Sequence, residues 1–219
     1  VTTSTGKLGW AGAASVLVAM WSARAGVGAM MIGLNSVYSE RNRNAARHYL
    51  RALMLTFTLV MVGLIALITV VIAPIVLSFI PLGVFGYFVA EIIRWSIAIL
   101  VLLAGVGVLY RFGPNRRAAR IGWLTWGAVF AVFSWAVVSI GFSYYVANFG
   151  NYNQVYGSIG AVIAMLVWLW ISSFLVLMGA SWNAQVELRT RPDSTIGRDR
   201  PLGKRGAYVA DNLVSVSEE

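Results

Sequence analysis

A single basic residue, Arg24, interrupts an apolar run that covers residues 8–34. An arginine in the middle of a membrane-spanning helix costs about 2.5–3.5 kcal/mol on insertion scales, so its charge needs a compensating environment. One interpretation is a polar cavity or anion site inside a helix bundle. The other is that the side chain reaches the headgroups, because a helix of this length measures about 40 Å against a hydrocarbon core of about 30 Å.

Glu91 and Arg94 are the other charged residues inside an apolar run. They lie three residues apart, so they share one face of a helix and can form an ion pair. We favour a structural pair, with an outward-facing vestibule as the alternative.

Asn35, Asn183 and Gln185 lie near the ends of apolar runs. Such amides often join transmembrane helices, at about 0.6 kcal/mol per hydrogen bond. We interpret them as interhelical contacts rather than substrate contacts. Asn35 and Asn183 nevertheless stay candidates, with Arg24, Glu91 and Arg94, for a transport cavity.

The chain contains few residues of the types that carry catalysis. The chain has no cysteine and one histidine, His48. Metal-dependent or acid–base nuclease chemistry needs clustered ligands or a paired acid and base. Glu91 is the only acid well inside a run, and Glu187 lies at the edge of one. We therefore expect no catalytic residue, no metal, no cofactor and no enzymatic activity.

The elements that position these residues are long apolar segments. Hydrophobic residues make up 59% of the 219 residues and charged residues 11%, against about 25% charged in an average soluble domain. The runs are residues 8–34, 52–79, 85–110, 121–149 and 156–185. Each is long enough to cross a bilayer as a helix, and none alternates like a strand. We predict an all-α transmembrane bundle over residues 1–187. Pro74, late in the second run, should kink or break its helix.

Basic residues gather in alternate connections. Four arginines precede or open the second run, four lie between the third and fourth, and six of the 17 Lys and Arg follow residue 185. The first eight are Arg41, Arg43, Arg47, Arg51, Arg111, Arg116, Arg117 and Arg120. Residues 80–84 and 150–155 contain none. Short basic loops stay in the cytoplasm, which predicts that Val1 is outside and the C-terminus inside.

These eight arginines are expected to bind anionic lipid headgroups. RNA binding is the alternative, but the clusters lack interleaved aromatic residues for base stacking, so we expect no specific nucleic acid. The polar residues 188–219 are expected to form a flexible cytoplasmic tail.

Several landmarks together resemble the YihY/BrkB family of bacterial inner-membrane proteins, some of which carry the name ribonuclease BN. They are residues 21–26, 34–38, 110–115, 142–146 and 156–162, followed by Gly179, Ala180 and Asn183. The resemblance covers about residues 10–187. It implies a location in the bacterial inner membrane and a fold of six helices, of which this chain would lack the first.

Function follows less directly than fold. The apolar spans favour a transporter or permease-like protein for a small solute or lipid, and so do the intramembrane Arg24 and the helix irregularity expected at Pro74. A non-catalytic scaffold or interaction protein of the cell envelope is the alternative, and a ribonuclease is a remote one. A homo-oligomer is compatible with either of the first two.

Overall fold

The structure, a computed structural model, describes residues 5–80, 83–148, 150–190 and 192–212. Five long helices dominate these ranges, which contain no β-strand beyond an isolated bridge between Ala119 and Thr195. The elements are α1 (Thr5–Val37), α2 (Ala45–Leu67), a π-helical turn η1 (Ile68–Ile72), α3 (Ala73–Leu77), α4 (Gly83–Phe112), α5 (Ile121–Asn148), α6 (Gly150–Leu188) and the short α7 (Tyr208–Asp211). The predicted all-α bundle with five membrane-spanning helices is confirmed.

The helices are apolar on nearly every side. Large side chains in the middle of the spans point away from the protein, among them Leu100, Phe133 and Trp170, which are 64%, 68% and 69% exposed. Hydrocarbon offers backbone amides no partner, so each segment must satisfy its own hydrogen bonds as a helix. The apolar exterior and the helical backbone therefore have the same cause, a lipid environment.

The connection between the fourth and fifth spans is shorter than expected. Residues 150–155, expected as a connection between the fourth and fifth apolar runs, lie inside α6, which starts at Gly150. The segment has no proline to stop a helix. Some parts of the predicted spans, connections and tail lie outside the described residues, namely residues 1–4, 81–82, 149, 191 and 213–219.

The chain does not break at Pro74. Proline lacks an N–H group and its ring clashes with the carbonyl four residues earlier. The helix accommodates it by widening into the π-helical turn η1, after which the N–H of Ala73 donates to the carbonyl of Ile68. Of the two predicted outcomes, a kink or a break, the break does not occur: Ala45–Leu77 is one continuous span that is locally distorted at η1.

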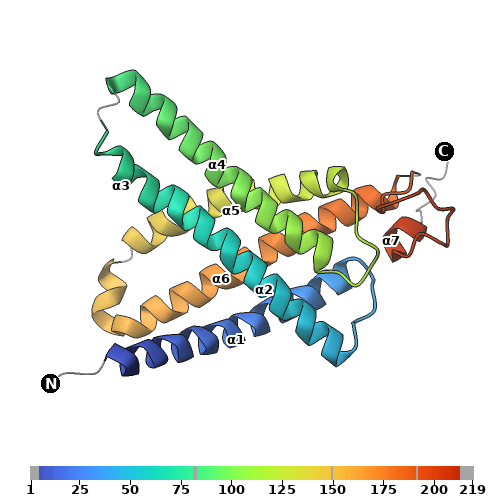
Figure 1. Ribbon diagram of the computed structural model, residues 1–219, viewed down its shortest axis with the longest axis horizontal. Helices are drawn as coiled ribbons and strands as arrows, with labels where there is room; N and C mark the ends of the chain where they lie inside the picture. The colour runs from blue at the N-terminus through green and yellow to red at the C-terminus, as the bar shows by residue number, and fades with distance from the viewer. Residues whose placement is uncertain (1–4, 81–82, 149, 191, 213–219) are drawn as a thin grey trace.

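The three basic segments meet at one end of the bundle (Figure 1, right). We call this end, formed by residues 38–44, 113–120 and 192–212, the basic end. Arg43 donates to the carbonyl oxygens of Gly113 and Pro114, at 2.7 and 2.5 Å. The N–H of Arg117 donates to Gly206 at 2.8 Å. The alternation of basic and neutral connections predicts this shared end.

The packed core lies next to the basic end. Its fully buried members include Leu34 of α1, Tyr110 of α4 and Ala180 of α6. Gly127 of α5 and Gly179 of α6 let their helices touch, because a Cβ atom on Gly127 would lie 2.1 Å from the carbonyl oxygen of Gly179. Small residues thus bring the backbones together where the core is densest.

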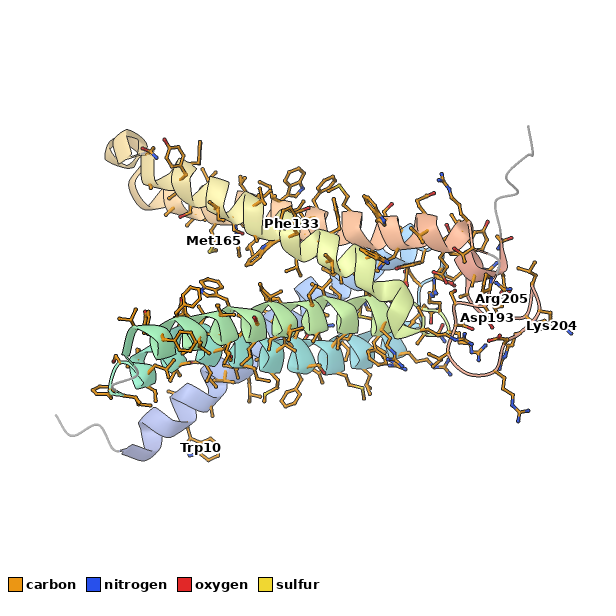
Figure 2. The ribbon with its side chains drawn as sticks, turned by 90° about the horizontal axis from the view of Figure 1, so that it is seen from above. Trp10, Phe133, Met165, Asp193, Lys204 and Arg205 are labelled. Atoms are coloured by element: carbon orange, nitrogen blue, oxygen red, sulfur yellow. The ribbon has the colours of Figure 1, made fainter. Side chains whose placement is uncertain are left out.

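The helices separate toward the opposite end, where α3 and α5 end and α4 and α6 begin. We call it the neutral end. Figure 2 shows the α2/α4 pair and the α5/α6 pair diverging there, while α1 crosses between them. In the most apolar window of each span, at most 17% of the residues are buried. The bundle is closed at the basic end and open at the other.

The C-terminal segment is folded over residues 192–212, unlike the flexible tail expected from its composition. Asp193, Ser194 and Thr195 are at most 4% exposed, and α7 buries Val209 and Ala210. Internal hydrogen bonds and contacts with both basic connections hold this segment, which covers the basic end as a cap.

Candidate functional site

A buried ion pair lies at the centre of the basic end. Arg116 donates two hydrogen bonds to the carboxylate of Glu187, at 2.8 and 2.6 Å, and the side chains are 2% and 4% exposed. Ser194 of the cap donates to the same carboxylate. Although burial opposes the charge of Arg116, the hydrogen bonds from its guanidinium to Glu187 raise its pKa. The pair joins the α4–α5 connection, α6 and the cap.

Tyr38 packs against this pair. The guanidinium of Arg116 lies over the Tyr38 ring, 4.8 Å from its centre. Burial raises the pKa of Tyr38, which keeps its hydroxyl neutral, and a hydrogen bond from Asn183 reaches it. The ring and the ion pair therefore form one polar plug between α1, α6 and the α4–α5 connection.

Asn35 and Asn183, two of the candidate residues, each form hydrogen bonds that connect separate segments of the chain. The side-chain oxygen of Asn183 accepts the backbone N–H of Gly127 at 2.8 Å, which ties α6 to α5. Asn35 accepts the N–H of Asn115 and donates to Asn42, each at 2.8 Å. The Asn183 contact is the interhelical one expected, whereas Asn35 joins the end of α1 to the two basic connections. Gln185 is exposed.

Asp193 organises the cap. Its carboxylate accepts hydrogen bonds from the N–H and hydroxyl of Thr195, at 2.9 and 2.7 Å, and from the N–H of Arg200 at 2.9 Å. Burial opposes ionisation, but these hydrogen bonds outweigh it and lower the pKa of Asp193. The carboxylate of Glu40 accepts a hydrogen bond from the N–H of Tyr208 at 2.7 Å, and burial raises the pKa of this second carboxyl group.

Arg24 lies apart from the plug, where α1 passes the start of α2. Its guanidinium lies 4.2 Å from the ring centre of Tyr49 and 5.3 Å from that of Trp21. Its Nε atom is buried and has no hydrogen-bond acceptor among the described residues. Two aromatic rings, rather than a carboxylate, lie beside this charge.

Glu91 and Arg94 pair with each other on α4, toward the neutral end. Trp95 donates from its indole nitrogen to Glu91 at 2.9 Å. This geometry is that of the structural alternative. The structure therefore does not bring Glu91, Arg94 and Arg24 into one cavity with Asn35 and Asn183.

The eight arginines expected at headgroups divide into two groups. Arg41, Arg47 and Arg51 are exposed, and headgroup binding stays a prediction for them. The others are held by the protein or partly buried: Arg43 by backbone carbonyls, Arg116, Arg117 and Arg120 by acids of the C-terminal part, and Arg111 against the ring of Phe112.

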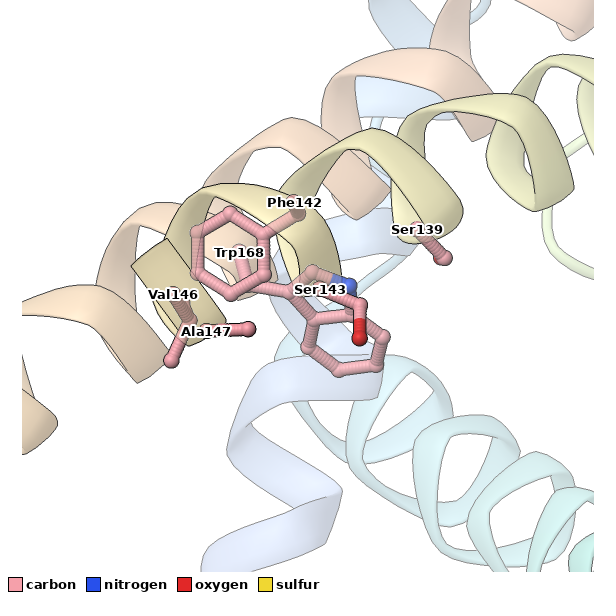
Figure 3. Close-up of a pocket in the computed structure, with 6 residues that line it drawn as sticks. All are labelled: Ser139, Phe142, Ser143, Val146, Ala147 and Trp168. Atoms are coloured by element: carbon pink, nitrogen blue, oxygen red, sulfur yellow. The ribbon is translucent and has the colours of Figure 1, made fainter. Parts of the chain in front are cut away.

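A shallow, open cleft of about 470 Å³ lies on the α5/α6 pair (Figure 3). Its lining is Ser139, Phe142, Ser143, Val146 and Ala147 of α5 and Trp168 of α6. The hydroxyl oxygen of Ser139 is buried without a partner in the described structure. The cleft thus combines an apolar wall with a free hydroxyl group, which suits a molecule that is partly polar.

Sequence reasoning missed the plug and the cleft as functional candidates. The sequence alone predicts that Arg116 lies at the lipid surface and that Glu187 is an isolated acid at the edge of a span. One signal was present: a carboxylate next to an apolar run requires a cation or hydrogen-bond donors. The serines of α5 carried no signal, because a hydroxyl group is common in membrane helices.

Comparison with known proteins agrees with this architecture. The family model for virulence factor BrkB matches residues 1–202. The chain is 35% identical over 184 residues to the putative ribonuclease-like protein YfkH of Bacillus subtilis, a match covering 81% of this chain and 66% of YfkH. It is 34% identical over 87 residues to a UPF0761 membrane protein of Tolumonas auensis, covering 39% of this chain and 28% of that protein.

A UPF0761 membrane protein of Xanthomonas campestris is 32% identical over 111 residues, which are 50% of this chain and 26% of the relative. The chain thus spans less than two thirds of the length of these relatives. No solved structure matches it significantly. With five apolar spans and a family match over nearly its whole length, this chain is an integral membrane protein of the virulence factor BrkB family.

Proposed function

We propose that this chain is the membrane core of a permease-like protein that moves a small solute or a lipid across the bacterial inner membrane. The observation that carries the proposal is the asymmetry of the bundle. A buried polar plug closes the basic end, while the helix pairs diverge toward the neutral end. Alternating access needs such a closed side and such an open side.

The cleft on α5 and α6 is the proposed entry site. It lies in the half of α5 nearest the neutral end, toward which the helix pairs diverge (Figure 2). Ser139 and Ser143 contribute hydroxyl-bearing side chains to the lining, and Phe142 and Trp168 offer apolar contact. A solute with a polar and an apolar part fits this lining better than a bare ion does.

The proposed orientation puts the basic end in the cytoplasm. Short arginine-rich connections remain on that side. Single cysteines can test this directly because the chain has none of its own. Ser39→Cys should react with a membrane-impermeant maleimide only in inverted vesicles, and Asn151→Cys only in intact spheroplasts. The opposite pattern would refute the orientation.

Flux through proteoliposomes tests the proposed activity. We expect the purified protein to accelerate the movement of a tail-labelled fluorescent phospholipid, or of solutes from a panel of ions and amino acids. Ser139→Trp should fill the cleft and reduce the flux several-fold. Ser96→Trp, on the exposed surface of α4, is the matched control and should leave the flux unchanged. Absence of flux for every probe would reject the proposal.

A non-catalytic envelope scaffold is the second candidate. The observation that favours it is the folded cap, which presents exposed arginine and lysine side chains beside the helices. In that case the protein should show no flux, and a partner should cross-link to single cysteines in residues 196–204. Flux in liposomes that contain only this protein would argue against a purely structural role.

Ribonuclease activity is the remote candidate, raised by the name of YfkH. The described residues hold no group of three or more side chains that could bind a metal ion. Glu187, which lies next to a cation, is already saturated by Arg116 and Ser194. We expect purified protein to cleave RNA no faster than its Glu187→Gln variant does.

A further inference from the structure

Arg24 has no anion within the described protein to balance its charge. The described carboxylates number six, and each has a partner elsewhere. Those partners are Tyr208 for Glu40, Arg94 for Glu91, Arg116 for Glu187, Thr195 for Asp193, Arg120 for Asp199 and Arg205 for Asp211. A buried guanidinium nitrogen without an acceptor costs free energy. An anion from outside this part of the chain would remove that cost.

The aromatic rings leave a specific part of Arg24 available. Tyr49 and Trp21 lie near the guanidinium and stack edge to face with each other, their centres 5.7 Å apart. Ring faces attract the cation but accept no ordinary hydrogen bond from it. The N–H groups of a guanidinium lie in its plane, in a fork that matches phosphate or carboxylate. Arg24 is thus held by aromatic contacts, and its Nε has no acceptor among the described residues.

The depth of Arg24 in the membrane matches the level of the lipid headgroups. Tyr49 is the fifth residue of α2, so it lies only about 6 Å along the helix from its first residue, Ala45. The Arg24 guanidinium beside it is therefore near the membrane boundary at the basic end, although Arg24 is central in the sequence of its span. Arg47 and Arg51, exposed on the same turns of α2, add positive charge.

The surrounding surface fits acyl chains. Leu17 and Trp21 of α1 are 70% and 60% exposed, and Met54 and Phe57 of α2 are exposed as well. These apolar side chains lie within about two turns of Arg24 on α1 and of Tyr49 on α2, and the described protein leaves them exposed. A free anion would use only the charge, whereas a phospholipid would use the charge and this surface together.

We propose that Arg24, which packs against Tyr49 and Trp21, binds the phosphate group of an anionic phospholipid at the crossing of α1 and α2. The guanidinium donates to the phosphate oxygens, and the acyl chains lie along the exposed sides of α1 and α2. This site is separate from the cleft on α5 and α6, and it does not depend on the proposed transport.

Native mass spectrometry of the purified protein, titrated with a short-chain phosphatidylglycerol, tests this site. We expect tighter binding than for phosphatidylcholine. Arg24→Gln should weaken phosphatidylglycerol binding by about tenfold, the loss expected for a hydrogen bond to a charged group. Arg94→Gln removes an arginine that already has a carboxylate partner and is the matched control, which should bind like the original chain.

Two further arms keep the result decisive. If Arg24→Gln does not fold, Arg24→Lys keeps the charge but loses the planar fork, and it should bind several-fold more weakly. Inorganic phosphate in large excess should not displace the lipid. Unchanged binding in the folded Arg24 variant, or displacement by inorganic phosphate, would overturn the proposal. Because no flux is measured, failure here leaves the transport proposal standing, and failure of transport leaves this site standing.

Discussion

The two ends of the bundle use charge in different ways. At the basic end, Arg116 and Glu187 are buried and saturated, and three separate segments of the chain meet around them. Toward the neutral end, Glu91 and Arg94 pair within one helix and connect nothing else in the described structure but Trp95. A charge pair that joins distant segments fixes a fold, whereas a pair within a helix only neutralises itself.

The largest effect should follow from breaking the pair at the basic end. Glu187→Ala leaves Arg116 buried without its partner, which typically costs about 3–5 kcal/mol. Glu91→Ala is the matched change toward the other end, where the carboxylate is 34% exposed and its partner Arg94 lies on the same helix, so no contact between segments is lost. Thermal unfolding in detergent should show a much larger fall in Tm for Glu187→Ala. Equal falls would remove the distinction between the two ends.

A second test concerns the close helix contact. Gly127→Ala inserts a methyl group 2.1 Å from the Gly179 carbonyl oxygen, so α5 and α6 must move apart. Overpacking of this kind costs roughly 1–3 kcal/mol. Gly141→Ala, on the neutral half of the same helix, meets nothing within 4 Å and should leave Tm unchanged or slightly raised. A similar loss for both variants would mean that α5 is packed evenly along its length.

The cap should contribute least and should depend on pH. The pKa of Asp193 is lowered in the folded protein, so its contribution is present above the ordinary Asp pKa and is lost as pH falls through the folded-state value. Asp193→Asn should lower Tm at pH 7 by the equivalent of about 1 kcal/mol. The difference in Tm between this variant and the original chain should shrink as pH falls below the ordinary Asp pKa of 3.8. A difference that is constant with pH would show that ionised Asp193 does not hold the cap.

Hydropathy predicted the spans because the solvent alone dictates helices there, and the arginine pattern predicted the common basic end. The pairing of Arg116 with Glu187 could not be predicted, because the two residues lie 71 positions apart. Neither composition nor local spacing shows that the fold brings them together. Residues 192–212 read as flexible because they are polar, yet their polar groups fold by bonding one another and the basic connections. Arg24 had two interpretations, and only the position of Tyr49 reveals its surroundings.

The divergence of the helix pairs is measured most directly by distances between spin labels in lipid nanodiscs. One pair of labels joins Phe85 of α4 with Ala147 of α5 at the neutral end, and the other joins Phe112 with Trp126 of the same helices at the basic end. Two helices packed along their length have axes about 8–10 Å apart at both ends. We predict a clearly longer separation for the neutral pair than for the basic pair. Equal separations would contradict a bundle that is closed at one end and open at the other.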